Sequence, residues 1–283
     1  MLLGAISALS LVSGLAVCFG AGAFGGLSWL WILPLTFLGT FLILVGIGFA
    51  FLLILCRRVD QSVPQEQDDR LYRIVTELVI ESALPFLRIH VKKTGVEKIP
   101  TDGRFLLVAN HTNDSDPIIL LYALPKRQLA FISKRENSSM FVIGPMMHKI
   151  QCQLINREND REALKTILRC IQIIKEDKAS IAVFPEGGTN QDDKLHPFRP
   201  GVFKIAQKAN VPIVVCTIRN TNRVIGNLLK LKGSAVDLHL LEVIPAESLE
   251  GRTTVDIAQQ VYDIMAADLG EENILTPEEE ENA

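Results

Sequence analysis

Residues 1–56 contain no Asp, Glu, Lys, Arg or His. Such an uncharged stretch is typical of membrane segments, because about 20 consecutive apolar residues cross the hydrocarbon core of a bilayer. All 29 Lys and Arg and all 32 Asp and Glu therefore lie in the rest of the chain. This uneven distribution excludes a simple water-soluble globule and a disordered chain. The lack of a later long apolar run excludes a multi-pass transporter.

Cysteine is scarce and scattered. The five cysteines show no CxxC spacing, and two of them lie in or at the edge of the uncharged segment. An odd, dispersed set argues against a disulfide framework and against a zinc site. We therefore expect a reducing compartment. The cysteines are Cys18, Cys56, Cys152, Cys170 and Cys216.

A strong net charge is lacking as well, since the formal value is −3. Residues 271–283 contain six Glu and no base, so the rest of the chain has 29 basic against 26 acidic residues, a balance of +3. A weakly basic body suits a membrane surface or a phosphate-bearing substrate. The bias is too weak to indicate nucleic acid as a partner. The composition of residues 271–283 predicts an acidic disordered tail.

The uncharged segment, residues 1–56, is long enough for two membrane-spanning helices. Trp29 and Trp31 are the two tryptophans of the chain, and they interrupt the apolar run as an aromatic belt at a membrane interface would. A cleaved signal peptide is disfavoured, because no basic residue precedes the run. We predict a two-helix membrane anchor, with helices at residues 2–24 and 31–56.

Arg57 and Arg58 follow the second predicted helix directly. By the positive-inside rule this end is cytoplasmic, so we expect a membrane protein whose soluble domain lies on the cytoplasmic face. The alternative is that the first, Gly-rich segment enters only one leaflet. Gly22 and Gly26 have the small-xxx-small spacing that lets two membrane helices approach closely.

Residues 57–86 are interpreted as a juxtamembrane linker with an amphipathic helix. Apolar residues recur there at positions i, i+3, i+4, i+7 and i+8, which is one face of a helix. Acidic side chains precede the run, where they favour the positive end of the helix dipole. Such a helix either packs on the body or rests on the lipid surface. The predicted apolar face consists of Leu71, Ile74, Val75, Leu78 and Val79.

Residues 87–270 alternate short apolar runs with helical patterns. This alternation predicts an α/β domain with a mixed or parallel sheet flanked by helices. Ligands in such sheets bind at the carboxyl ends of strands. The expected strands are residues 87–91, 105–109, 128–133, 152–155, 180–184, 213–217 and 236–243. The expected helices are residues 117–124, 138–148, 160–176, 201–210 and 254–269.

Polar residues follow the predicted strand at residues 105–109. His111 stands just past its end, and Asp116 precedes Pro117 and the next helix. An Asp that accepts from one imidazole nitrogen leaves the other nitrogen free to take a proton, so the pair can form a base with its orienting carboxylate. Asp116 also has a purely structural interpretation, as the N-cap of a helix that begins with Pro.

A metal site is the alternative interpretation of the same segment. His111, Asp114 and Asp116 would then need a further ligand from a later loop, and Glu186 is the candidate. Such a set would suit a metal-dependent phosphohydrolase. We favour the base interpretation, in which the protein has no resident metal.

A second group of candidate functional residues follows the predicted strand at residues 180–184. Glu186, Gly187 and Gly188 indicate a turn whose backbone N–H groups face a ligand, and a plain Gly-rich turn is the alternative. Arginine can bind a phosphate through two parallel hydrogen bonds, whereas most single surface bases are merely solvated. Basic residues near these segments are Arg157, Arg199 and Lys204.

Four segments occur in a fixed order: Asn110-His111 through Asp116, Ile155-Asn156-Arg157, Phe184-Pro185-Glu186-Gly187 and Val211-Pro212-Ile213. Together they resemble the four blocks of the lysophospholipid acyltransferases, and most closely those of the 1-acyl-glycerol-3-phosphate acyltransferases. Each block is weak alone, but four in order behind a membrane anchor form a strong signal. The resemblance covers roughly residues 88–245.

The resemblance implies a membrane-anchored O-acyltransferase of the glycerolipid type. It would transfer an acyl chain from an acyl thioester to the free hydroxyl of a lysophospholipid, converting 1-acyl-sn-glycerol-3-phosphate to phosphatidic acid. His111 would be the general base, and Asp116 would hold it. The partners would be membrane lipid and acyl-CoA or acyl carrier protein, with no other cofactor and no covalent enzyme intermediate.

The same resemblance implies residues that bind the acceptor. Arg157 would bind its phosphate, with Lys134 as a helper. Glu186 and Gly187, with the adjacent Gly188, would position its glycerol-phosphate part. The block at residues 211–213 would shape the acyl or donor side.

The chain departs from the family pattern on the phosphate side. The third block in the family continues Gly-Thr-Arg, but Asn190 stands in place of that arginine. Gln151 and Asn156 replace a Gly and an Asp of the second block, and Val215 replaces a second Pro of the fourth. These changes leave the base intact. They leave open another acceptor, such as glycerol-3-phosphate or another lysolipid, and a non-catalytic lipid-binding membrane protein.

Overall fold

The computed structural model describes residues 2–156, 159–190 and 192–275, and within them seven strands form one sheet. Short runs rich in β-branched residues become buried strands, because a sheet pairs the backbone groups that burial removes from water. Each strand overlaps one predicted from the sequence, with shifted ends. The strands are β1 (Ile89–Thr94), β2 (Leu106–Ala109), β3 (Leu129–Lys134), β4 (Gln153–Ile155), β5 (Ser180–Val183), β6 (Ile213–Arg219) and β7 (Ser234–Ile244).

The strand order across the sheet is β1-β7-β6-β2-β5-β3-β4. Only the β6–β7 pair is antiparallel among these described strands, and the other neighbours are parallel. The expectation of an α/β fold with a mixed sheet is therefore confirmed. The carboxyl ends of β2, β5, β6, β3 and β4 share one edge of the sheet, which is where ligands bind in such folds.

Five helices around the sheet were expected, and all five occur, one with the predicted ends and four with shifted ends. The segment predicted as a helix at residues 138–148 differs most, because residues 135–139 form a 3₁₀ turn and the α-helix starts only at Ile143. One further helix, α8 (Arg223–Leu229), was not expected. The other five are α4 (Asp116–Ala123), α5 (Ile143–Lys149), α6 (Asp160–Lys175), α7 (Lys204–Ala209) and α9 (Thr254–Leu269).

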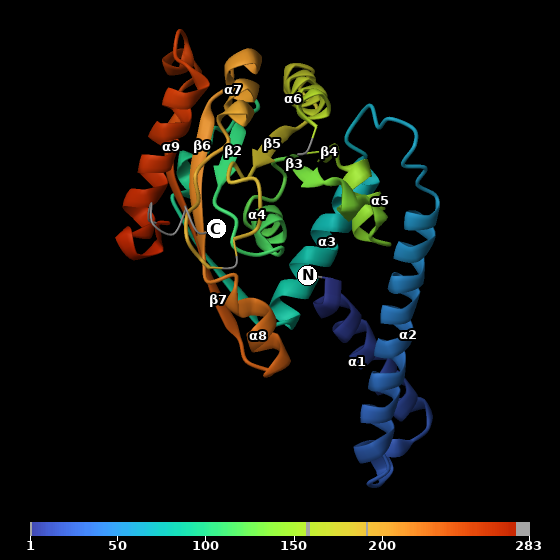
Figure 1. Cartoon of the computed structure of the whole chain (residues 1–283). Coiled ribbons are helices and arrows are strands. Elements are labelled where there is room, and N and C mark those ends of the chain that lie inside the picture. The colour runs from blue at the N-terminus through green and yellow to red at the C-terminus, as the bar shows by residue number, and fades with distance from the viewer. Residues whose placement is uncertain (1, 157–158, 191, 276–283) are drawn as a thin grey trace.

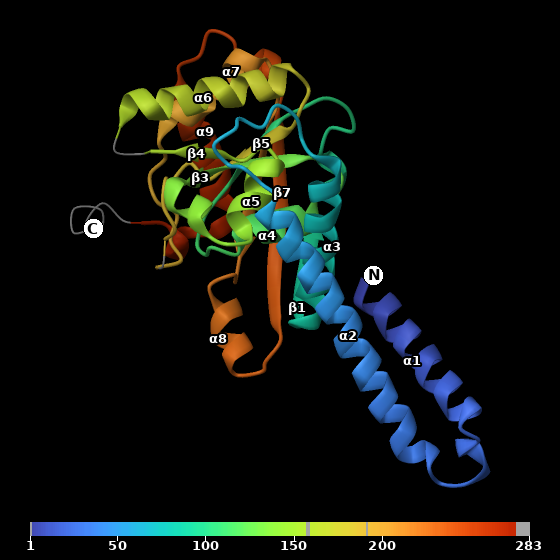
Figure 2. The same cartoon turned by 90° about the vertical axis from the view of Figure 1, so that its right-hand side faces the viewer.

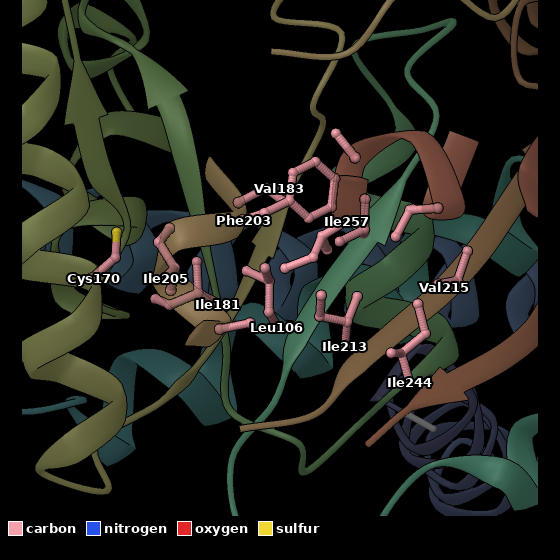
Figure 3. Packing of buried hydrophobic residues seen from close by; sticks show 14 of the residues in the cluster. Leu106, Cys170, Ile181, Val183, Phe203, Ile205, Ile213, Val215, Ile244 and Ile257 are labelled. Atoms are coloured by element: carbon pink, nitrogen blue, oxygen red, sulfur yellow. The ribbon is translucent and has the colours of Figure 1, made fainter. Parts of the chain in front are cut away.

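Alternate side chains of the central strands pack into two separate hydrophobic cores, one on each face of the sheet. Leu106 and Val108 face α6, α7 and α9, whereas Leu107 and Ala109 face α3 and α4. Figure 3 shows the first core, in which Ile181 of β5 and Ile213 of β6 lie beside Leu106. Because both faces are covered, the central strands are apolar throughout, and the polar chemistry is confined to their ends.

Helix α3 (Arg70–Phe86) packs on the body through a face that the sequence pattern did not indicate. The predicted amphipathic helix is present, and its apolar residues Leu71, Ile74 and Val79 stay exposed. The helix packs on the body through other residues, among them Arg73 and Ile80. A periodic apolar face marks residues that avoid water, and it does not say whether protein or lipid covers them.

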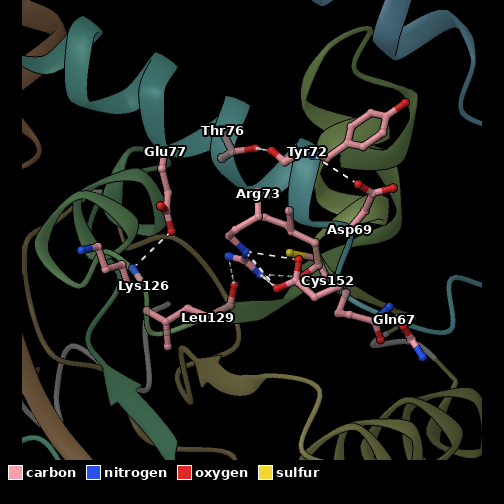
Figure 4. Close-up of polar contacts among 12 residues, drawn as sticks. Gln67, Asp69, Tyr72, Arg73, Thr76, Glu77, Lys126, Leu129 and Cys152 are labelled. Atoms are coloured by element: carbon pink, nitrogen blue, oxygen red, sulfur yellow. Dashed lines mark hydrogen bonds and ion pairs between the residues drawn. The ribbon is translucent and has the colours of Figure 1, made fainter. Parts of the chain in front are cut away.

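Arg73 attaches α3 to the sheet (Figure 4). Its Nε and Nη2 donate to Asp68 Oδ2 at 3.0 and 2.7 Å, Nη1 donates to the Leu129 carbonyl at 2.8 Å, and Nη2 also donates to the Ile150 carbonyl at 3.1 Å. Burial raises the pKa of Asp68, and the bonds from Arg73 oppose this rise. A buried charge that keeps such partners is tolerated, whereas a buried charge without them is strongly destabilising.

The uncharged segment forms a hairpin of α1 (Leu2–Gly20) and α2 (Trp29–Arg57), which extends away from the sheet (Figures 1 and 2). Both helices are long and apolar enough to span a membrane. The expected contact through Gly22 and Gly26 is wrong, because open space surrounds both. On α1, the buried residues Ser10, Gly14 and Cys18 form the contact with α2 instead. A Cβ on Gly14 would come within 2.9 Å of the Leu33 side chain of α2.

The start of the predicted tail lies against the body. Leu195 donates its backbone N–H to the Asn273 carbonyl at 2.8 Å, and its own carbonyl accepts from Leu275 at 3.2 Å. Residues 276–283 lie outside the described residues. The predicted domain boundaries at residues 56 and 86 stay predictions, while α2 ends at Arg57 and α3 at Phe86.

Replacing Arg73 by Met should lower the free energy of unfolding by about 3–5 kcal/mol, because Asp68 and two carbonyls then lose their buried partner. Thermal unfolding of detergent-solubilised protein, followed by circular dichroism, would measure the change. Arg70→Met is the matched control, since Arg70 is exposed on the same helix. Equal stability of the two variants would contradict this role of Arg73.

Candidate active site

His111 and Asp116 meet in the loop that links β2 to α4. Asp116 Oδ2 lies 2.9 Å from His111 Nδ1 and accepts the backbone N–H groups of Thr112 and Asn113, each at 2.9 Å. Because an ionised carboxylate only accepts, Nδ1 carries the imidazole proton and Nε2 is left as the acceptor. The predicted pair of a base and its orienting carboxylate thus has the geometry that it requires.

Asp116 is fully buried and is the first residue of α4, whose N-cap is Ser115. The N-cap interpretation of Asp116 was therefore wrong by one residue. Its carboxylate folds the loop onto His111 rather than capping the helix. All three of these contacts are made by Oδ2.

Glu186 joins this loop to the loop that follows β5. Its Oε1 accepts the backbone N–H of His111 at 2.7 Å, and its Oε2 accepts the backbone N–H of His196 at 2.9 Å and a hydrogen bond from the Asn190 side chain. Burial raises the pKa of Glu186 to about 8, although the two backbone N–H donors act in the opposite direction. Both of its oxygens are thus engaged by the protein itself.

Asn110 holds the His111 loop from the other side. The side chain of this buried residue donates to the Ile218 carbonyl at 2.9 Å and accepts the Ile218 N–H at 2.7 Å. Asn110 therefore joins the end of β2 to β6 just before His111. The His111 loop is bound on one side to the segment after β5 through Glu186 and on the other to β6 through Asn110.

Two neighbours of the imidazole were not singled out from the sequence. Phe184 stacks on His111 with 4.1 Å between ring centroids. Thr189 Oγ1 lies 3.1 Å from His111 Nε2 and 3.0 Å from Asp114 Oδ1. A hydroxyl can therefore reach Nε2 from the loop side. Both neighbours follow β5, and the only signal in the sequence was their closeness to Glu186.

A cavity of about 720 Å³ opens beside His111. Its wall is largely apolar and is built from α3, α4, α5 and α6, with Leu52 contributed by α2. His111, Thr189 and Asp114 line the cavity as one group, joined by the contacts of Thr189 Oγ1. The cavity can therefore hold a long apolar group with its reactive end at the imidazole.

Two basic residues line this cavity, Lys134 at the end of β3 and Arg199. Arg199 lies against Gly187, which has φ = 82°, and a Cβ at that position would be 2.6 Å from Arg199 Nε. Glycine is thus needed at position 187 for its backbone and for this close approach. Gly188 has open space around it. Arg157 lies outside the described residues.

The four residues of the metal alternative do not form a common ligand set. Nowhere in the described parts of the chain do three or more His, Cys, Asp or Glu side chains gather as a metal site would require. His111 and Asp116 bond to each other, and Glu186 accepts N–H groups with both oxygens.

Known proteins support the interpretation of this site. Residues 90–219 match the family model described as Acyltransferase, and these residues include the loops of His111, Asp116 and Glu186. Over these residues the α/β domain matches the acyltransferase family. The resemblance noted in the sequence is thereby confirmed.

Several named relatives share this domain. It is similar to a chloroplastic 1-acyl-sn-glycerol-3-phosphate acyltransferase of Brassica napus, 32% identical over 50% of this chain and 40% of that protein. It is also similar to the 1-acyl-sn-glycerol-3-phosphate acyltransferase of Borreliella burgdorferi, 27% identical over 66% of this chain and 76% of that protein. The chain spans about half the length of several relatives that it matches.

The fold is similar to that of a solved structure. The crystal structure of the 1-acyl-sn-glycerophosphate acyltransferase PlsC from Thermotoga maritima superposes with a TM-score of 0.60 and 21% identity. The similarity covers 79% of this chain and 88% of that chain.

The raised pKa of Glu186 predicts a pH-dependent stability. The unfolded carboxyl titrates near 4.5, and the folded one near 8, so the folded state holds more protons between these values. Stability should therefore fall by a few kcal/mol as the pH rises from about 5 to 8. Melting of Glu186→Gln should depend less on pH in this window, whereas the exposed control Glu97→Gln should behave as the unmodified protein. An unchanged pH dependence in Glu186→Gln would contradict the raised pKa.

Proposed function

We propose that this protein is an O-acyltransferase that transfers an acyl chain from a thioester to the free hydroxyl of 1-acyl-sn-glycerol-3-phosphate and so forms phosphatidic acid. The observation that carries the proposal is the His111–Asp116 pair at the polar end of a long apolar cavity, inside an acyltransferase-family domain. The relatives named above, whose titles give this activity, support the same substrate class.

The chemistry follows from the state of His111. Its Nε2 removes the proton of the acceptor hydroxyl while that oxygen attacks the thioester carbonyl carbon. The tetrahedral intermediate then collapses, the carbon–sulfur bond breaks, and the imidazolium returns its proton to the leaving thiolate. Asp116 stabilises the imidazolium through Nδ1. General base catalysis of this kind contributes roughly 10²- to 10⁴-fold.

Glu186 acts as a positioning residue in this scheme. The acceptor-binding role implied by the resemblance is less compatible with its geometry, because both oxygens are engaged by His111, His196 and Asn190. Asn190 stands where the family has an arginine, and its amide contributes to the same network. Glu186 thus keeps the His111 backbone in place while substrate binds elsewhere.

The acyl chain of the donor occupies the apolar cavity. Each buried CH₂ contributes about 0.8 kcal/mol, so a fatty chain binds by hydrophobic burial alone. The thioester carbonyl then lies at the end that holds His111. Acyl-CoA and acyl carrier protein both present such a thioester, and the proposal needs no further cofactor.

The acceptor phosphate meets the basic end of the cavity. Lys134 and Arg199 line it, and Arg157 follows β4 in the sequence. Arg199 takes the place of the arginine that the third block lacks, because its guanidinium already lies over Gly187 of that block. The open space beside Gly188 leaves room for the glycerol-phosphate part, while Gly187 lets Arg199 approach closely.

We propose that the hairpin anchors this site at the cytoplasmic face of a membrane. Arg57 and Arg58 end α2, which suits the positive-inside rule. Leu52 of α2 lines the cavity, so a lipid tail can pass from the bilayer toward His111 without crossing water. The acceptor and the product are both lipids, and this arrangement removes the cost of exposing their chains.

His111→Ala should lower acyl transfer at least about 100-fold and leave folding intact, because only the base is lost. Thiol release from acyl-CoA and from acyl carrier protein would be measured on detergent-purified protein with 1-acyl-sn-glycerol-3-phosphate, glycerol-3-phosphate and other lysolipids. His90→Ala is the matched control, since His90 is exposed on β1.

Three outcomes of that assay would count against the proposal. Near-normal turnover of His111→Ala would show that His111 is not the general base. Release of inorganic phosphate from the acceptor, abolished by excess EDTA, would favour the metal-dependent phosphohydrolase. The absence of thiol release with every donor and acceptor pair would favour a lipid-binding protein without catalysis.

Arg199→Gln should raise the KM for the phosphate-bearing acceptor about 10- to 100-fold with little change in kcat, because a hydrogen bond to a charged group contributes roughly 1.5–3 kcal/mol. Lys208→Gln, an exposed change of equal charge on α7, is the control. A KM for Arg199→Gln within twofold of the control (a difference of about 0.4 kcal/mol, too small for such a bond) would exclude contact with the phosphate.

A further inference from the structure

An exposed apolar surface lies at α8 and the turn that follows it. Leu229 and Leu231 are each 81% exposed, and Phe86 at the end of α3 is 71% exposed. Val224 holds α8 to the body as a buried residue. We call Phe86, Arg88, Leu229, Lys230, Leu231 and Lys232 the α8 patch.

Bonds between the two segments make the α8 patch one surface. Arg88 Nη1 donates to the Leu231 carbonyl at 3.3 Å, and the Arg88 carbonyl accepts the backbone N–H of Ser234 at 3.0 Å. Ile89 and Ser234 then pair as the first residues of β1 and β7. The end of α3 and the turn after α8 are therefore held side by side.

The sheet topology places the α8 patch at the edge that carries the active site. Strand β6 pairs in parallel with β2, so both end at the same edge. The chain passes from β6 to α8, as it passes from β2 to His111. Figures 1 and 2 show α8 reaching beyond the sheet on the side toward which the α1–α2 hairpin extends.

The charge of this region has one sign. Between Arg219 and Asp237 the chain has no Asp or Glu, and its cations are Arg219, Arg223, Lys230 and Lys232. Arg219 is paired with Asp268, whereas Lys230 and Lys232 are exposed beside the two leucines. Exposed leucine next to lysine suits the boundary between lipid tails and anionic headgroups, where each cation adds to the attraction.

We propose that the α8 patch is a second membrane contact, which rests on an anionic lipid surface in the leaflet that the hairpin enters. The inference rests on the membrane placement in the proposed function. A hairpin alone leaves the domain free to rotate about its axis. A second contact on the active-site edge fixes the rotation, so that the cavity beside His111 faces the lipid that supplies the acceptor.

The test uses the full-length protein in vesicles with an environment-sensitive thiol dye at Leu231→Cys. The native cysteines are free and buried, so the introduced thiol is labelled selectively. Leu168→Cys on α6 is the matched control, since Leu168 is also exposed, at 55%. Vesicles would contain phosphatidylcholine alone or with anionic phosphatidylglycerol, together with lipids that carry a quencher near the headgroup.

Quenching at position 231 should exceed that at position 168 several-fold and should rise with the anionic lipid. Lys230→Glu with Lys232→Glu should weaken the contact roughly fivefold per lysine, and high salt should act in the same direction. Equal quenching at the two positions would overturn the proposal. So would a dye response that follows protein concentration instead of lipid, since that would make the α8 patch a contact between copies.

Activity distinguishes this inference from the proposed function. The doubly substituted protein should transfer acyl groups normally to a detergent-dispersed acceptor and several-fold more slowly to one in anionic vesicles. Equal slowing in detergent would overturn the orienting role. Quenching at position 231 in a protein that is inactive with every acceptor would leave the membrane contact standing and would contradict only the catalytic assignment.

Discussion

The parallel pairing of β2 with β5 and β6 is the constraint on which the site depends. It brings the ends of three strands to one edge and allows residues 75 positions apart, His111 and Glu186, to bond. Two buried carboxylates then hold the loop: Asp116 orients the imidazole, and Glu186 holds the backbone of His111 itself. Asn110 completes the attachment by bridging to β6.

This arrangement explains why polar groups stand inside an otherwise apolar fold. A buried carboxylate is tolerated only where hydrogen bonds replace its water. Asp116 Oδ2 receives two backbone N–H donors and lies 2.9 Å from the imidazole Nδ1. Burial penalises the charged form of Glu186, and its pKa rises accordingly. The two acids thus serve one histidine in different ways: one orients its ring, and the other fixes its backbone.

The exposed apolar surfaces of the protein have one physical explanation. The hairpin, the outer face of α3 and the α8 patch all expose apolar side chains, and the cavity beside His111 is itself lined by α2 and α3. Soluble proteins rarely keep so much apolar surface without a partner. A bilayer that covers these surfaces also supplies the substrate of the proposed reaction, so anchoring and substrate access have the same physical cause.

Local patterns in the sequence were sufficient to predict the uncharged hairpin, the seven strands, the α/β class and the His111–Asp116 pair. Each depends on residues close in the chain: an apolar run, an alternation of runs, or two polar residues in one loop. Strand ends also indicated where chemistry lies, since buried strands have room for polar groups only at their ends.

Only the tertiary structure decided what those residues contact. It turned Glu186 toward the His111 backbone, placed Arg199 over Gly187, moved the helix seam to Gly14 and buried Arg73 in place of the expected face of α3. It also built α8, whose few residues show no helical period. These features depend on contacts between segments far apart in the chain. Periodicity reports that a side chain avoids water, but three-dimensional packing selects the strand, the helix or the lipid that covers it.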